Sequence, residues 1–294
     1  MAAPYYLAIR GRLVVVGKEP DGDSVRFIAE HPEHYRQLKN AHRIDPSADG
    51  SVQLRFEGVD APELHYGSAA QPLGREARDQ LLAWIGFSDL DYAPPGETRV
   101  TSATPESVPA FILSQAAEVN GRPVSYLLLE EQAAPAQDGA WTLVDRPMLD
   151  RTLNARLLQE GVAYPTVYSS TPVGHRAHLR TLATEAREKA AGVWAIDASA
   201  GFVLDDQASI GPEGQLILPK LFRRATDYLR ARDGGFQGNL ADWLLQVSAS
   251  PSRNENDQVV VCGGIEVHLS DLLLQANRTV RFQADLLDVV FVEK

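Results

Sequence analysis

The sequence predicts a mixed α+β protein in two parts, a larger one over residues 1–200 and a smaller one over residues 201–294. Two observations favour this class. Short runs that alternate apolar and polar residues, typical of strands, are interspersed with longer segments whose apolar residues recur every three or four positions, as in amphipathic helices. The chain also changes character after Trp194, where the polar segment 197–215 is interpreted as a linker.

The strand patterns come first along the chain. Residues 7–30 are predicted to form two strands around a turn at Asp21-Gly22-Asp23, because Asp-Gly is a common hairpin signal. Residues 29–50 follow as a polar surface insertion. A single strand over residues 51–63, SVQLRFEGVDAPE, is expected to end at Pro62. Two further strands are expected at residues 108–115 and 122–131, joined by the turn EVNG.

Helices are expected over residues 73–86, 149–164 and 175–195. In the first, Leu73, Ala77, Leu81 and Ile85 recur on one face. In the second, Asp150 is a plausible N-cap and Gly161 a C-terminal stop. The smaller part is expected to contain a helix over residues 218–235, a short helical piece at 270–275, and strands at 259–264, 279–284 and 289–293.

The composition limits the classes of function. The chain has 28 Lys and Arg against 39 Asp and Glu, a net charge of −11, which argues against coating nucleic acid by bulk attraction. An enzyme that handles a phosphodiester in a small basic pocket remains compatible. The single cysteine, Cys262, excludes an internal disulfide and is interpreted as a small buried hydrophobe. Without a signal peptide or membrane-spanning run we expect a cytoplasmic protein with no membrane partner, a trimmed secreted form being the alternative.

The stretch DGDSVRF has two interpretations, a plain hairpin turn or half of a metal site. The second depends on partners elsewhere, and RFEGVDAPE supplies them. Asp60 is expected at the end of a strand, and Pro62 forces Ala61 into an extended conformation. The Ala61 carbonyl and the Glu63 carboxylate can then converge beside Asp60. A hard cation such as calcium prefers carboxylate and carbonyl oxygens, of which Asp23, Asp60 and Ala61 would supply three.

Two arginines complete this set. Arg55 shares a face of the expected strand with Val59, and Arg122 directly follows the turn that opens the next strand. Paired arginines suit a phosphodiester, and with a metal ion and a carboxylate that activates water they suit phosphoryl transfer. Each arginine alone is also compatible with an ordinary surface ion pair, so the interpretation rests on the whole set.

These segments, with QPLGREARDQLLAWI, LNARLLQEGVAY and HLRTLATEAREKAAGVW, closely resemble the staphylococcal nuclease (thermonuclease) family over roughly residues 8–196. The resemblance implies a five-stranded OB-fold β-barrel with three helices. It also implies a calcium-dependent, sugar-non-specific nuclease that cleaves DNA and RNA, with single strands preferred. The residues it implies are Asp23, Asp60 and the Ala61 carbonyl as calcium ligands, Asp21 just outside them, Glu63 as general base, Arg55 and Arg122 as the phosphate clamp, and Tyr164 and Tyr168 against a base.

Some features depart from the family. Ala61 stands where the family often has threonine, which a backbone ligand tolerates, and Asn120 replaces a common aromatic residue. The insertion and the acidic composition disfavour binding of long duplex DNA. Cationic residues in LFRRATDYLRAR, with the preceding Lys220, are interpreted as a solvated helix face rather than a nucleic-acid contact. His31, His34 and His42 are interpreted as solvated loop residues rather than zinc ligands.

Two rival functions stay open. The first is a binding module for nucleic acid or protein on the same fold, against which the retained acids and arginines argue. The second is a nuclease that acts within a homo-oligomer or a protein complex through its C-terminal part. The sequence assigns no role to residues 201–294.

Overall fold

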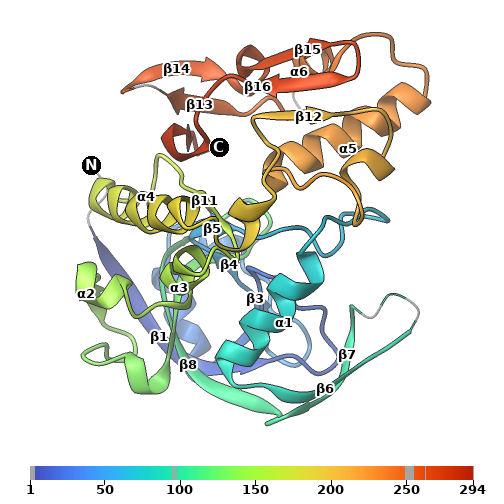
Figure 1. Ribbon diagram of the computed structural model, residues 1–294. Helices are drawn as coiled ribbons and strands as arrows, with labels where there is room; N and C mark the ends of the chain where they lie inside the picture. Colours follow the sequence, from blue (N-terminus) through green and yellow to red (C-terminus); the bar gives the residue numbers. More distant parts are fainter. Residues whose placement is uncertain (1–3, 95, 97, 249–254, 262, 294) are drawn as a thin grey trace.

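The computed structural model describes residues 4–94, 96, 98–248, 255–261 and 263–293. It is a mixed α+β structure in which a strongly curved sheet forms the larger half and the C-terminal elements pack at one end of it (Figure 1). Cys262 lies outside the described residues, so its predicted burial stays a prediction.

The main sheet is nearly closed and barrel-like. Its strands follow the order β3-β2-β1-β8-β9-β4, and β10 pairs with β1. The neighbours on this path pair antiparallel, except for the parallel pair β4 and β9. Since β3 and β4 end the path but are separated in sequence by Leu54 alone, the two edges must meet. The strands are β1 Tyr5–Val14, β2 Arg26–Ala29, β3 Val52–Gln53, β4 Arg55–Phe56, β8 Ser107–Ala117, β9 Pro123–Leu129 and β10 Trp141–Leu143.

The segment 51–63 is not one strand, and this prediction is wrong. After β4 the chain turns at Gly58, whose φ of +79° favours glycine, and continues as β5, Gly58–Asp60. Strand β5 leaves the main sheet and pairs with β11, Tyr164–Thr166. A Cβ at Gly58 would lie 2.5 Å from Leu179 Cδ1, so a larger residue here would displace the Leu179 side chain of helix α4, Val173–Glu188. The predicted strands around the turn EVNG are confirmed as β8 and β9.

The helices of the larger half agree with the sequence in part. Helix α1, Gly74–Ile85, is confirmed. The expected helix 149–164 is instead α2, Arg146–Leu149, followed by α3, Leu153–Gln159, which is capped by the Thr152 side chain at 3.1 Å from Ala155 N. Asp150 is therefore not the N-cap, whereas the stop at Gly161 is confirmed.

Several segments that the sequence analysis treated as irregular are structured. The insertion 29–50 contains two 3₁₀ helices, η1 Pro32–Gln37 and η2 Ala41–Arg43, and buries Tyr35 and Leu38 in the main core. Strands β6 and β7 form a separate hairpin. These strands are Ser88–Tyr92 and Val100–Thr104, and the remaining 3₁₀ helices of this half are η3 Glu130–Gln132 and η4 Gly192–Ala195.

The described residues of the C-terminal half form two α-helices, two small sheets and three 3₁₀ helices. Helix α5, Pro219–Asp233, is confirmed, but α6, Leu240–Ser248, was not predicted. The supposed linker 197–215 buries Phe202 and Leu204, so that prediction is wrong. The short helical piece at 270–275 is confirmed in its first half, which lies in the 3₁₀ helix η6, whereas its second half belongs to strand β15. One sheet consists of β12 Gly201–Val203, β16 Thr279–Phe282 and β15 Leu273–Ala276. The other consists of β14 Ile265–His268, β13 Gln258–Val261 and β17 Val290–Phe291. The 3₁₀ helices are η5 Ala208–Ile210, η6 Leu269–Leu272 and η7 Leu286–Asp288.

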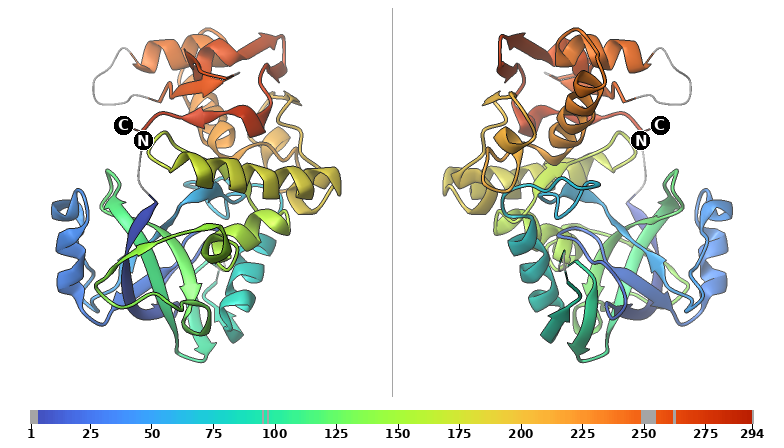
Figure 2. Two further views of the ribbon diagram at one scale, coloured as in Figure 1. Left: turned by 90° about the vertical axis from the view of Figure 1, so that its left-hand side faces the viewer. Right: turned by 90° about the vertical axis from the view of Figure 1, so that its right-hand side faces the viewer.

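The two halves are joined by direct contacts. The second hydrophobic cluster takes in Ala69, Tyr164 and Val193 from the larger half. The Ser169 amide donates to the Phe291 carbonyl at 2.7 Å, which ties β17 to the segment after β11. Helix α4 lies between the sheet and the C-terminal elements (Figure 2). These contacts place α5 over one end of the curved sheet.

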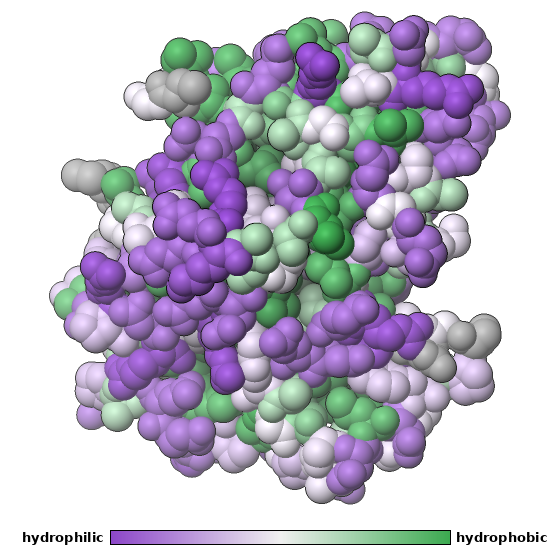
Figure 3. Space-filling view, in the orientation of Figure 1, coloured by the Kyte–Doolittle hydropathy of each residue, from purple (hydrophilic) through white to green (hydrophobic). Residues whose placement is uncertain are grey.

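The outer surface facing the viewer in Figure 3 is predominantly hydrophilic, with hydrophobic residues in small groups. Among the described residues, no helix combines the length and the apolar character needed to cross a bilayer.

Candidate active site

The turn Asp21-Gly22-Asp23 is fixed against the segment that carries Asp60 and Glu63. Asp21 N donates to Ser24 O at 3.0 Å, which closes the turn, and Asp23 Oδ2 accepts from Ala61 N at 3.2 Å. A Cβ at Gly22 would lie 2.7 Å from the Ala61 Cβ, so glycine is required for this close approach. The stretch is thus both a turn and the wall of a pocket.

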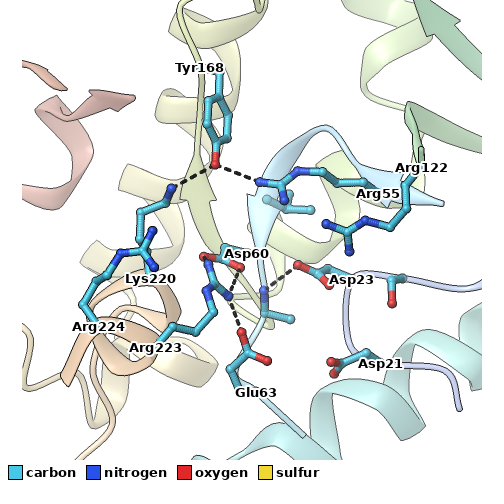
Figure 4. Close-up of a pocket in the computed structure, with 13 residues that line it drawn as sticks. Asp21, Asp23, Arg55, Asp60, Glu63, Arg122, Tyr168, Lys220, Arg223 and Arg224 are labelled. Atoms are coloured by element: carbon cyan, nitrogen blue, oxygen red, sulfur yellow. Dashed lines mark hydrogen bonds and ion pairs between the residues drawn. The ribbon is translucent and has the colours of Figure 1, made fainter. Parts of the chain in front are cut away.

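The pocket has a volume of about 320 Å³ and lies where the turn, β4, β5 and α5 meet. Four carboxylates and five cationic side chains line it (Figure 4). The lining includes all predicted site residues except Tyr164, together with three residues that the sequence analysis did not place there: Asp21, Asp23, Arg55, Asp60, Ala61, Glu63, Arg122, Tyr168, Lys220, Arg223 and Arg224.

The two predicted arginines are held by different partners. Arg55, on β4, donates from Nη2 to the Tyr168 hydroxyl at 2.8 Å. Arg122, just before β9, donates from Nε to Glu118 Oε1 at 3.0 Å. The parallel pairing of β4 and β9 brings the two arginines to the same side of the pocket (Figure 4). A phosphate between them would meet two preformed donors.

The carboxylates are crowded in a poorly solvated place. Burial, followed by repulsion from Asp60 and Glu63, raises the pKa of Asp23 to about 7. Burial and the neighbouring acids also raise the pKa of Asp21 well above its ordinary value. Burial raises the pKa of Glu63 despite the opposing effect of Arg223. Raised pKa values of this kind mark a site that gains from additional positive charge.

Tyr168 joins the two halves of the protein at the pocket. Its hydroxyl contacts Arg55 and also Lys220 Nζ, at 3.0 Å. Burial acts to raise the pKa of the Tyr168 phenol, but Lys220 and Arg55 together lower it. The Tyr168 hydroxyl therefore holds Arg55 and Lys220 in place. The centroid of its ring lies 5.8 Å from that of Phe291.

Tyr164, by contrast, does not reach the pocket. Its side chain is fully buried, its hydroxyl donates to Asp197 Oδ1 at 2.9 Å, and its ring packs against Trp194. The prediction that it packs against a substrate base is corrected, because β11 turns it into the second core.

Helix α5 supplies the three unforeseen residues. Lys220, Arg223 and Arg224 are spaced i, i+3 and i+4, so they share one face of the helix. The interpretation of this face as solvated is wrong for these residues, since Lys220 is only 6% exposed. The i, i+3, i+4 spacing of these cations was the sequence signal that they share a helix face. The spacing does not show whether that face meets solvent or the rest of the protein.

Arg223 makes the most direct contact with the acids. Its guanidinium donates to both Asp60 carboxylate oxygens, at 3.1 and 2.8 Å, and also to Glu63 Oε1. In Figure 4 the α5 cations face Arg55 and Arg122 across Asp60. Asp60 and Glu63 therefore already share one cationic partner, the Arg223 guanidinium.

The carboxylate oxygens that line the pocket are of the chemical type that a hard cation prefers. Aspartate and glutamate oxygens are what calcium prefers, and their crowding is relieved by positive charge. Among the described residues, no three of these acids bring ligand atoms within 4.8 Å of one another, whereas His31, His34 and Asp138 do. Calcium binding by the acids thus requires some side-chain rotation around Asp60.

The cluster of His31, His34 and Asp138 is explained by hydrogen bonds within the protein. His31 Nδ1 lies 2.6 Å from Asp138 Oδ2, and His34 Nε2 lies 3.3 Å from the same oxygen. Asp138 also accepts from Arg10 N at 2.8 Å. The cluster therefore ties the insertion to the loop before β10, and the three histidines of the insertion are not uniformly solvated.

No protein-family model matches the chain, and no curated protein is significantly similar to it.

Proposed function

We propose that the protein is a metal-dependent nuclease of the thermonuclease type, with an OB-fold barrel, that hydrolyses phosphodiester bonds of DNA and RNA. The observation that carries the proposal is the convergence in one pocket of four carboxylates and two arginines, one on β4 and one just before β9. Neither a plain hairpin turn nor a set of surface ion pairs requires this convergence.

The proposed roles follow from position. Asp23 and Asp60, with the Ala61 carbonyl, would hold a calcium ion, and Asp21 would lie just outside. The bound ion would supply Lewis-acid stabilisation of charge on the phosphate. Arg55 and Arg122 would bind the phosphate oxygens, where their charge counts most in the transition state.

Glu63 would act on the attacking water. A general base works best when its pKa lies near the working pH, and burial moves the pKa of Glu63 in that direction. Its carboxylate lies near Asp60, because both contact the same guanidinium. A water held there would be oriented by the base beside the proposed metal ligand.

The test is digestion of single-stranded DNA, duplex DNA and RNA by the purified chain, with calcium, with magnesium and with chelator. We expect calcium-dependent cleavage, strongest on single strands. Glu63→Ala, Arg55→Ala and Arg122→Ala should each lower turnover by orders of magnitude while the fold is kept. Arg278→Ala is the control, because Arg278 is exposed and pairs with Asp205 away from the pocket. Full activity in folded Arg55→Ala would contradict the assigned role.

A binding module is the second candidate. It is favoured by the ion pairs of Arg223 with Asp60 and Glu63, which give two of the four acids a cationic partner without a metal. No cleavage with any metal by the folded chain, together with binding of single strands, would select it.

A further inference from the structure

The most unusual feature of the pocket is a cation from one half of the protein placed on the acids of the other. Arg223 comes from α5, 163 positions along the chain from Asp60 and 160 from Glu63. Every hydrogen bond described for its side chain ends on these two acids. The proposed metal ligand Asp60 and the proposed base Glu63 are thus bridged by one guanidinium.

The contact is geometrically strong. Each terminal nitrogen of Arg223 donates to a different oxygen of Asp60, the fork arrangement that gives arginine–carboxylate pairs their strength. The three side chains are only 22%, 9% and 12% exposed for Arg223, Asp60 and Glu63. Water therefore screens the ion pairs weakly.

We propose that Arg223 occupies the position of the divalent cation and sets the affinity of the site for it. The inference rests on the proposed function. Calcium and the guanidinium need the same Asp60 oxygens, and two positive groups cannot share them without repulsion. Calcium must therefore displace Arg223, which weakens its apparent binding.

The surrounding contacts allow Arg223 to move while α5 stays in place. Lys220 remains anchored to the Tyr168 hydroxyl at 3.0 Å and to Asp257 at 3.5 Å. Arg224 pairs with Asp257 at 2.9 Å. These anchors hold the helix to both halves, so displacement needs only rotation of one side chain. The C-terminal half then has a definite role, which is to control metal loading.

The test is isothermal titration calorimetry of the full chain with calcium chloride near neutral pH, which reads binding rather than activity. Arg223→Gln removes the competing charge and keeps a polar side chain. We expect it to bind calcium at least tenfold more tightly than the unmodified chain. Arg230→Gln is the matched control, because Arg230 lies on the same helix and pairs with Asp227. It should bind calcium within about twofold of the unmodified chain.

Equal or weaker calcium binding by Arg223→Gln, with binding retained by the unmodified chain, overturns this inference alone. Absence of calcium binding in both proteins overturns the inference together with the metal-dependent function. Circular dichroism checks the fold of each variant. Should Arg223→Gln not fold, Arg223→Met keeps the packing of the aliphatic stem, and the same tenfold gain is expected from it.

Discussion

Glu57 offers a sharp test of the electrostatics of this fold. Its side chain is 8% exposed, on the short link between β4 and β5, and Oε1 accepts from the Tyr6 hydroxyl at 3.1 Å. Burial raises the pKa of Glu57 from an ordinary 4.5 to about 7, although the Tyr6 and Thr171 hydroxyls act in the opposite direction. The ionised carboxylate is therefore costly in the folded state.

We predict that Glu57→Gln stabilises the protein, and more so at pH 8 than at pH 5. The folded state holds the Glu57 proton above pH 4.5, where the unfolded chain releases it, so stability falls as pH rises toward about 7. At about 1.4 kcal/mol for each pH unit between the two pKa values, the loss reaches about 3 kcal/mol at pH 8 and about 1 kcal/mol at pH 5. Glutamine never ionises, and its amide oxygen still accepts from Tyr6.

Urea unfolding of both proteins at pH 5 and pH 8 gives the required free energies. The gain from Glu57→Gln should be about 2 kcal/mol larger at pH 8. Glu213→Gln, at an exposed position, is the control and should show no such pH dependence. A gain that is the same at both pH values, or a loss that grows with pH, would refute the assignment of a raised pKa to Glu57.

Three further predictions concern the pocket and the insertion. Tyr168→Phe removes the hydroxyl bonded to Arg55 and Lys220 and should lower kcat/KM about tenfold, the scale of one hydrogen bond to a charged group, with circular dichroism to check that the variant is folded. Glu118→Gln removes the anion that holds Arg122 and should lower the rate of single-strand cleavage several-fold, whereas an unchanged rate would show that this ion pair does not position the arginine. The hydrogen bond to Asp138 raises the pKa of His31. This contact therefore stabilises the folded protein below the ordinary histidine pKa, and the stabilisation is lost as pH rises through the pKa of His31 in the folded state. NMR titration of His31 should show that raised pKa, and a value at or below that of a free histidine would contradict the contact.

Local patterns predicted much of the larger half. The strand-forming runs of β8 and β9, the turn before Arg122 and the four-residue repeat of α1 all depend on neighbours in sequence, and each is confirmed. The turn Asp21-Gly22-Asp23 was equally local. The interpretation of this turn as part of a site was not local, since it required the segment RFEGVDAPE to fold against the turn.

Other features failed because tertiary contacts decided them. The break after β4 accompanies the positive φ of Gly58 and the pairing of β5 with β11, a partner far along the chain. The supposed linker is polar in composition, yet Phe202 and Leu204 are enough to anchor it in the second core. Tyr164 lies four residues before Tyr168, but β11 directs it into the interior. Sequence spacing alone does not say which of two tyrosines faces a pocket.

The sequence by itself indicated most of the residues of the larger half that line the pocket. Acids flanking a glycine and arginines at strand starts have a meaning that depends on residue type and local geometry, which the chain encodes over a few positions. Only the tertiary structure decided what faces them. Arg223 reaches Asp60 from an element distant in sequence, and its helix face has the same periodicity whether it meets water or carboxylates. The difference is the docking of α5, which depends on long-range packing that no local pattern contains.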